Sequence, residues 1–242
     1  MTETDPNIRQ RPAGTWTPAV ASILDDLAAA GVHAPRHLSL HGNTETVTHL
    51  EGLVPIRPYP PEVLTDDALA SVGRLLRRHH DALDPHPRPG TQVLAGWPGR
   101  PPDTVCHNDC GPWNIVYQNG KAVALIDWDL ARPGPALLDL ALAAWHHIPL
   151  YNDADAASFG WAAPPNRYQR LRLLCNAYGV PLTPALLDDV AIWHHMTIAT
   201  ARWAHRNPTH PAARPWLKVN IDGVAADRQW LRLHTQEILA ER

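Results

Sequence analysis

The fold and the chemistry of this chain are decided by residues 105–134, VCHNDCGPWNIVYQNGKAVALIDWDLARPG. Asn119-Gly120 between two apolar runs is typical of a β-hairpin. Five polar residues flank this hairpin on its two sides: His107, Asp109, Asn114, Asp127 and Asp129. Because paired strands lie about 4.8 Å apart, the two ends of the hairpin should meet. We therefore expect Asn114 and Asp127 to be neighbours, with Asp109 close by.

This grouping of oxygen atoms suits a magnesium site. Mg²⁺ usually takes one or two protein ligands together with substrate phosphates, and Asn114 and Asp127 supply such a pair. The third group, Asp109, is then free to orient or deprotonate a hydroxyl. That division of labour is what phosphoryl transfer requires, since its catalysis consists mostly of positioning and charge neutralisation.

Composition excludes several other classes of protein. The chain has 242 residues, a formal net charge of -3 and 45% hydrophobic residues, which predicts a globular protein without a basic surface for nucleic acid. Three cysteines do not form a disulfide framework. No apolar run approaches the roughly 20 residues of a membrane helix, and the polar N-terminus does not resemble a secretory signal. We expect a cytoplasmic protein that binds neither nucleic acid nor membrane.

Local signals along the chain predict a small sheet followed by helices. A helix begins with Thr17 as its N-cap and ends at Gly31, and a hairpin follows around 42–43. The proline-rich residues 53–64 suggest a connector, so we predict one domain at 1–52 and another at 53–242. Thr65 should cap the next helix, and 84–103 should form a loop. Further helices are predicted at 135–148, 165–178, 184–206 and 214–241.

The motif from His107 to Asn114, followed by Ile126-Asp127-Trp128-Asp129, resembles the aminoglycoside phosphotransferase and choline kinase family. This resemblance implies an α+β, protein-kinase-like fold of two lobes, with a shortened N-terminal lobe and a mostly helical C-terminal lobe. It implies transfer of the γ-phosphoryl group of ATP or GTP, with Mg²⁺, to a hydroxyl of a small molecule. Such an acceptor would be aminoglycoside-like, an amino alcohol or another natural product.

The same resemblance assigns roles to individual residues. Asp109 would be the catalytic aspartate, His107 would brace its loop, and buried Asp139 would anchor that loop to the next helix. Asn114 and Asp127 would hold Mg²⁺, with Asp129 as a secondary site residue. Two residues would lie near the nucleotide base: Leu50 and Glu51.

One expected feature of this family is missing from the sequence. Members carry a lysine on an early strand that pairs with the nucleotide phosphates, whereas no lysine precedes Lys121 here. Arg9 or Arg11 are the candidates to replace it, because a guanidinium binds phosphate well. Either the start of the chain is assigned too late, or the nucleotide lobe is short and the activity altered. A catalytically silent binding module, and a kinase acting on Ser or Thr of a peptide, therefore remain alternatives.

Two other patterns have simpler interpretations. Cys106, His107 and Cys110 have the spacing of zinc ligands, but no further pair follows, so we expect buried apolar cysteines. The tryptophans of the predicted helices, such as Trp145 and Trp193, should pack in the core, with the wall of a cleft as the less favoured role. Of the paired histidines, His146 or His147 is the candidate to line a substrate cleft.

Overall fold

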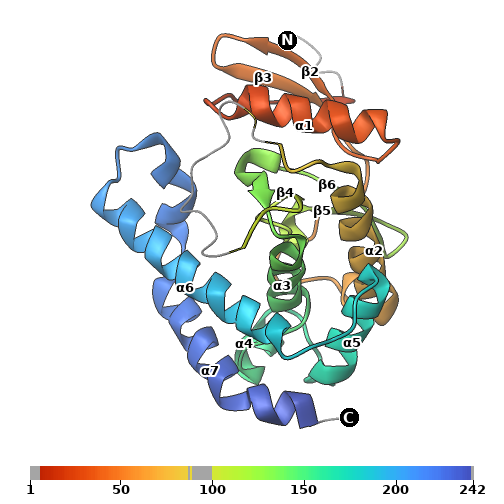
Figure 1. Cartoon of the computed structure of the whole chain (residues 1–242), viewed down its shortest axis with the longest axis vertical. Coiled ribbons are helices and arrows are strands. Elements are labelled where there is room, and N and C mark those ends of the chain that lie inside the picture. Colours follow the sequence, from red (N-terminus) through yellow and green to blue (C-terminus); the bar gives the residue numbers. More distant parts are fainter. Residues whose placement is uncertain (1–5, 87, 89–99, 241–242) are drawn as a thin grey trace.

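The computed structural model describes residues 6–86, 88 and 100–240, which form two lobes (Figure 1). The N-terminal lobe contains an antiparallel sheet with the strand order β1-β3-β2 and one helix that lies against it. Its elements are β1 (Ile8–Pro12), α1 (Thr17–Ala29), β2 (His37–His41) and β3 (Thr44–Thr48). The other lobe is mostly helical, so the predicted α+β class is confirmed.

Helix α1 joins the two lobes through its apolar face. Its four periodic apolar residues are at most 2% exposed and belong to the same buried cluster as residues of the helical lobe: Val20, Ile23, Leu24 and Leu27. The predicted cap is wrong by one position, because Trp16 occupies the N-cap. The Thr17 hydroxyl instead accepts a hydrogen bond from the Gly14 amide at 3.0 Å, outside the helix.

The helical lobe is built around helices that pack closely against one another in pairs. Its helices are α2 (Asp66–Ala82), α3 (Ala136–His147), α4 (Asp153–Ser158), α5 (Arg167–Tyr178), α6 (Ala185–Arg206) and α7 (Ile221–Ala240). As predicted, Thr65 caps α2, accepting from the Ala68 amide at 3.1 Å. A Cβ at Gly73 would come within 2.8 Å of the Leu174 carbonyl, so this glycine permits the close contact of α2 with α5. Among the described helices, none is long and apolar enough to cross a membrane.

Two nested hairpins form the centre of the molecule. The inner one pairs β5 (Ile115–Gln118) with β6 (Lys121–Leu125), as predicted, and both turn residues, Asn119 and Gly120, have positive φ. The outer one, which the sequence did not predict, pairs β4 (Thr104–Cys106) with β7 (Arg132–Gly134). The two chain segments between these hairpins, 107–114 and 126–131, therefore lie side by side.

Several predicted elements differ from the structure. The single helix expected at 214–241 is wrong: a 3-10 helix, η4 (Pro211–Lys218), is followed by a break at 219–220 and then α7. The extended Val219 ends η4, and the Asn220 side chain accepts from the Gly223 amide at 3.0 Å to begin α7. Helix α4, which Asn152 caps, had no apolar periodicity to reveal it. Most of the loop predicted at 84–103 lies outside the described residues.

The proline-rich connector runs between the lobes without forming a strand of its own. Leu53 makes an isolated bridge to Tyr117 of β5, with both backbone hydrogen bonds at 2.8 Å. A short 3-10 helix, η1 (Pro61–Val63), precedes α2. A domain boundary at residue 52 stays a prediction.

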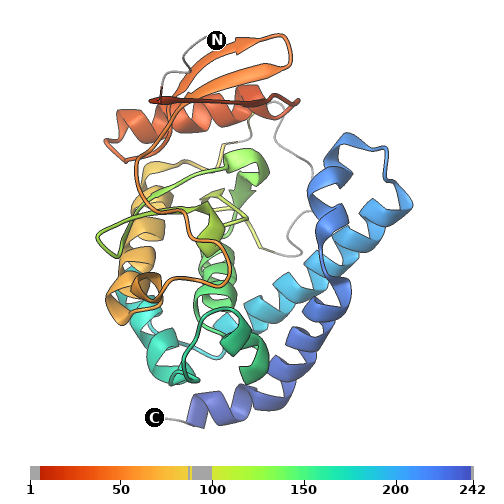
Figure 2. The same cartoon turned by 180° about the vertical axis from the view of Figure 1, so that it is seen from behind.

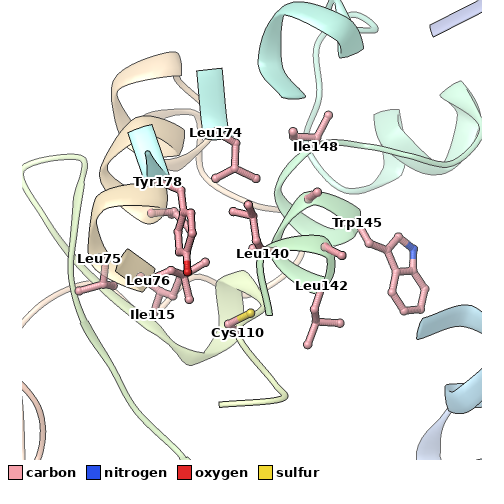
Figure 3. Packing of buried hydrophobic residues seen from close by; sticks show 14 of the residues in the cluster. Leu75, Leu76, Cys110, Ile115, Leu140, Leu142, Trp145, Ile148, Leu174 and Tyr178 are labelled. Carbon is pink, nitrogen blue, oxygen red and sulfur yellow. The ribbon is translucent and has the colours of Figure 1, made fainter. Parts of the chain in front are cut away.

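The main core fills the space between α2, α3 and α5 behind the nested hairpins. Figure 3 shows Leu76 of α2, Leu140 of α3 and Leu174 of α5 gathered on one side of α3. Trp145 points to the other side of the same helix. Helix α3 therefore has buried residues on both sides, and Trp145 belongs to the part of the core that faces α6 and α7.

The core also encloses neutral histidines, which makes stability depend on pH. Burial lowers the pKa of His79 to about 3 and that of His147 to about 4. The unfolded chain binds protons on these rings near pH 6.5. The free energy of unfolding is therefore highest above pH 6.5 and falls as pH drops from 6.5 toward these folded pKa values.

We expect His79→Gln to weaken this acid sensitivity. Each neutral buried histidine adds a slope of up to about 1.4 kcal/mol per pH unit below pH 6, and the variant removes one of them. Urea unfolding of both proteins at several pH values between 5 and 7 measures the difference in slope. Identical slopes would show that His79 is not buried in its neutral form.

Candidate active site

The two segments enclosed by the nested hairpins are joined by backbone and side-chain hydrogen bonds. The Ile126 amide donates to the Asn114 carbonyl at 2.9 Å, which places Asp127 directly beside Asn114. The His107 ring bonds through Nε2 to the Ile126 carbonyl at 3.0 Å, and its Nδ1 accepts from the Asp109 amide at 3.2 Å. His107 thus links the segment of Asp109 to that of Asp127.

Asp139 of α3 fixes the start of the first segment. Its carboxylate accepts from the backbone amides of His107 at 2.5 Å and Asn108 at 2.8 Å. Although burial acts in the opposite direction, these bonds and the neighbouring His80 hold the pKa of Asp139 below its ordinary value. The bond to Asp139 stabilises the positive φ of Asn108, which turns the chain toward Asp109.

Asp109 is oriented through both of its carboxylate oxygens. The Asn114 Nδ2 donates to Oδ2 at 2.7 Å, and the Trp113 indole donates to Oδ1 at 3.2 Å. Burial, together with repulsion from Asp127, raises the pKa of Asp109 to about 7, although both hydrogen bonds act to lower it. A carboxylate of this basicity in a fixed orientation suits the acceptance of a proton from a bound hydroxyl.

Arg11 connects the N-terminal lobe to the second segment. Its Nε donates to Glu45 at 2.7 Å, across the β1–β3 register, and its Nη1 contacts Asp129 at 2.9 Å and Asp127 at 3.4 Å. Burial raises the pKa of Asp129 to about 6, and Arg11 opposes that shift. Of the two arginines proposed to replace a lysine, Arg11 is therefore the one placed beside both aspartates.

Two cavities border this arrangement. The interlobe cavity, about 1010 Å³, is lined by residues of both lobes that include Arg9, Arg11, Leu50, Asp127, Asp129 and Arg214. The helical-lobe cavity, about 690 Å³, is lined by residues that include Arg57, Asp109, Trp113, Trp145, His146 and Asp227. Asp109 and the pair Asp127 and Asp129 therefore face different cavities, and Asn114 lies between them.

Two of the three remaining predicted site residues line the interlobe cavity. Arg9 contacts the His49 ring at 3.3 Å, and both residues line the cavity next to Leu50. Glu51 is not among the lining residues, and its carbonyl accepts from the Gln118 side chain at 2.9 Å. The structure thus brings the predicted residues together, except for Glu51.

The helical-lobe cavity contains His146, which the sequence offered as a cleft residue, and others that were not expected there. Trp145 and Trp193 line it, although both are almost fully buried and core packing was the favoured expectation. His146 lines the cavity, whereas His147 bonds to the Cys110 carbonyl. Arg57 was not predicted, because a connector arginine carries no periodicity or motif. The one available signal was the run of aromatic and histidine residues that follows the second segment.

The oxygen atoms present fit a magnesium ion. Asn114 uses Nδ2 to donate to the Asp109 backbone and side chain, at 2.8 and 2.7 Å, which leaves its Oδ1 as an acceptor. The Asp127 carboxylate is 56% exposed, and its one hydrogen bond or ion pair with a described residue is the long contact with Arg11. Within the described residues, no three His, Cys, Asp or Glu side chains could hold a metal by themselves. An ion here would need phosphate or water oxygens as well, as Mg²⁺ usually does.

We expect Arg11→Ala to destabilise the fold. The Glu45 side chain is 1% exposed. Without Arg11, the Glu45 carboxylate would keep one ion-pair partner among the described residues, His37. The expected loss is about 3 kcal/mol of unfolding free energy, and Arg11→Lys should recover part of it. Urea unfolding measures the difference.

The matched control is Arg77→Ala, which removes an exposed pair with Asp81 in α2. Such pairs contribute less than about 1 kcal/mol. Equal losses for the two alanine variants would contradict a structural role for the Arg11–Glu45 pair.

Comparisons with known proteins agree with this arrangement. Residues 91–174 match the model of the phosphotransferase enzyme family. The chain is also 34% identical, over 178 residues, to the trifolitoxin immunity protein of Rhizobium leguminosarum bv. trifolii, covering 70% of this chain and 67% of that protein. This chain belongs to the phosphotransferase enzyme family. The matched residues include both segments of the candidate site and helix α3, so the resemblance inferred from the motifs is confirmed.

Solved structures confirm the kinase-like fold of this family member. A choline/ethanolamine kinase family protein from Mesorhizobium loti is 17% identical, with a TM-score of 0.61 over 98% of this chain and 88% of that one. An amicoumacin kinase in complex with AMP-PNP, Ca²⁺ and Ami is 12% identical, with a TM-score of 0.57 over 96% and 80%. The phosphotransferase fold therefore extends over nearly the whole chain.

Proposed function

We propose that this phosphotransferase moves the γ-phosphoryl group of ATP, or GTP, to a hydroxyl of a small molecule. The observation that carries the proposal is the position of Asp109 in one cavity, hydrogen-bonded to Asn114, while Asp127 lines the adjoining cavity. A nucleotide in the interlobe cavity and an acceptor in the helical-lobe cavity would then meet at these residues.

Each residue has a defined part in the proposed reaction. The acceptor hydroxyl donates its proton to Asp109 while its oxygen forms a bond to the γ-phosphorus. The bond between that phosphorus and the β-phosphate oxygen breaks, and the nucleoside diphosphate leaves. His107 holds the Asp109 segment in place. Leu50, which lines the interlobe cavity, would contact the base through its backbone, whereas Glu51 lies outside that lining.

The phosphates and the metal would be held by groups at the front of the interlobe cavity. Asn114 and Asp127 would bind Mg²⁺, with Asp129 as a secondary ligand, and the ion would neutralise charge on the phosphates. Arg11, with Arg9 beside it, would contact the phosphate oxygens directly. The ATP analogue and divalent cation in the amicoumacin kinase structure support this choice of ligands.

The helical-lobe cavity favours an acceptor with a flat or apolar surface. A cavity of about 690 Å³ is within the range for a drug-sized ligand. The Arg57 guanidinium lies 3.8 Å from the centre of the Phe159 ring and 5.7 Å from that of Trp113. Because the Arg57 guanidinium already lies over the faces of these rings, they are not available for a cation–π contact with the acceptor. A cationic acceptor would have to bind the carboxylates of Asp155 and Asp227 instead.

The test is incubation of the protein with Mg²⁺, labelled ATP or GTP, and hydroxyl compounds that include aminoglycosides, amino alcohols and aromatic natural products. We expect a phosphorylated product for at least one class, and its mass identifies the acceptor. Absence of a product from every class, with nucleotide binding intact, would count against phosphoryl transfer to small molecules.

We propose immunity to a toxin as a second candidate function. The identity to the trifolitoxin immunity protein favours it, and the toxin would then be modified at a hydroxyl or simply bound. Expression in a trifolitoxin-sensitive host should increase survival on the toxin. If Asp109→Asn abolishes this protection, the toxin is phosphorylated. If protection persists, the protein acts as a binding module, and if wild type gives none, this candidate is rejected.

A further inference from the structure

The chain contains two lysines, and they lie in very different surroundings. Lys121 begins β6 and is exposed on the inner hairpin, where it lines neither of the two cavities described above. Lys218 is the last residue of η4 and lines both of them. Only Pro215 among the other described residues is common to both linings. Lys218 therefore stands where the two cavities adjoin.

The segment that carries Lys218 packs beside the two aspartates. Ala213 and Trp216 of η4 pack with Ala204 of α6 in a small buried cluster, and Leu130 packs against it. Leu130 directly follows Asp129 in the second segment of the candidate site. In Figures 1 and 2 the connection between α6 and α7 stands next to the nested hairpins and extends toward the N-terminal lobe. This packing fixes the backbone of Lys218 relative to the aspartates.

The Lys218 ammonium is also available to a ligand. It makes no hydrogen bond or ion pair with any other described residue, and its side chain is exposed. Arg11 differs in this respect, since its guanidinium already contacts three carboxylates. A triphosphate in the interlobe cavity would bring several negative charges. Because Arg11 already pairs with three carboxylates, further cationic groups are needed to neutralise those charges.

We propose that Lys218 binds the phosphoryl group that is transferred, from the helical lobe, in place of a lysine of the N-terminal sheet. This inference rests on the proposed function, since it takes the two cavities to hold the nucleotide and the acceptor. A cation at their junction contacts the γ-phosphate before, during and after transfer and stabilises its charge. Arg214 lines the interlobe cavity but not the helical-lobe cavity, and it would contact the other phosphates.

The first test uses an acyl-phosphate derivative of ATP with the wild-type protein. A lysine amine near the terminal phosphate attacks the acyl carbon, an amide bond forms, the bond to the phosphate oxygen breaks, and ATP leaves. Mass spectrometry then compares the two lysine peptides. We expect labelling of Lys218 that excess ATP with Mg²⁺ suppresses, and little labelling of Lys121. Equal labelling of both lysines, or labelling of Lys218 that ATP does not reduce, would overturn the inference.

The second test is kinetic. A charge-assisted hydrogen bond lost from a phosphate predicts that Lys218→Met lowers kcat/KM about 10- to 100-fold. Lys218→Arg should restore part of the activity, and Lys121→Met should keep the wild-type value. Equal thermal melting of the Lys218 variants and wild type excludes misfolding. Unchanged kinetics in Lys218→Met would reject the role.

The two tests separate this inference from the proposed function. If no acceptor is phosphorylated by wild type but ATP protects Lys218 from the acyl phosphate, the proposed transfer fails while the phosphate contact stands. If wild type phosphorylates an acceptor but the acyl phosphate does not label Lys218, the proposed function is supported and the Lys218–phosphate contact is rejected.

Discussion

Asp109→Asn is expected to lower kcat on the order of 10²- to 10⁴-fold while nucleotide affinity stays near the wild-type value. The amide keeps the size of the side chain but cannot accept the proton of the acceptor hydroxyl, and general-base catalysis contributes about this factor. Nucleotide affinity should persist because Asp109 lines the helical-lobe cavity and not the interlobe cavity. Steady-state kinetics and nucleotide titration calorimetry measure the two quantities separately.

The control for this substitution is Asp188→Asn, an exposed aspartate near the start of α6. It should leave both kcat and nucleotide affinity unchanged. A substituted Asp109 protein with wild-type kcat would mean that another group accepts the proton. A parallel loss of nucleotide affinity would mean instead that Asp109 belongs to the nucleotide site.

Asp127→Ala is expected to abolish the effect of Mg²⁺ on nucleotide binding and to reduce transfer about 10³-fold. Several kcal/mol of charge stabilisation by a metal correspond to that factor. Asp127 is the more exposed of the two aspartates beside Arg11, and it adjoins Asn114 through the Ile126 amide. Calorimetry with and without Mg²⁺ measures the coupling between metal and nucleotide.

Asp129→Ala tests whether Asp127, and not Asp129, is the main metal ligand. Asp129 pairs with Arg11 at 2.9 Å, so its removal should weaken the contact between the lobes more than the metal site. We expect Mg²⁺ still to strengthen nucleotide binding in this variant. The opposite ranking, with Mg²⁺ dependence lost only in Asp129→Ala, would make Asp129 the main ligand.

Local signals explain which parts of the molecule could be predicted. The Asn119-Gly120 turn and the Thr65 cap act within a few residues, and both occur as expected. The predicted hairpin was enough to place Asn114 near Asp127, because the turn of a hairpin fixes which residues of its two strands pair. Strands β4 and β7 are three residues long and pair across a distance of about 30 residues, so no local pattern revealed them.

The cavities could not be predicted for a similar reason. The helical-lobe cavity collects side chains from the connector, both site segments, and helices α3, α6 and α7. The helical residues among them, such as Trp145, carry a local pattern that core packing explains equally well, whereas the connector residue Arg57 carries no pattern. The break between η4 and α7 was also missed, and with it the position of Lys218. The sequence showed the scarcity of lysine but not where the second one lies.

The nested hairpins have a mechanical consequence. Asp109, Asn114 and Asp127 lie in one continuous stretch of chain that is closed on itself by β4–β7 and β5–β6, and Asp139 anchors it to α3. Arg11, by contrast, reaches these residues from a separate lobe. In the proposed reaction, a hinge motion between the lobes would change the contacts to the nucleotide while the spacing of Asp109, Asn114 and Asp127 remained constant. The proposed function would then use the N-terminal lobe to open the nucleotide cavity and the nested hairpins to keep the site residues in place.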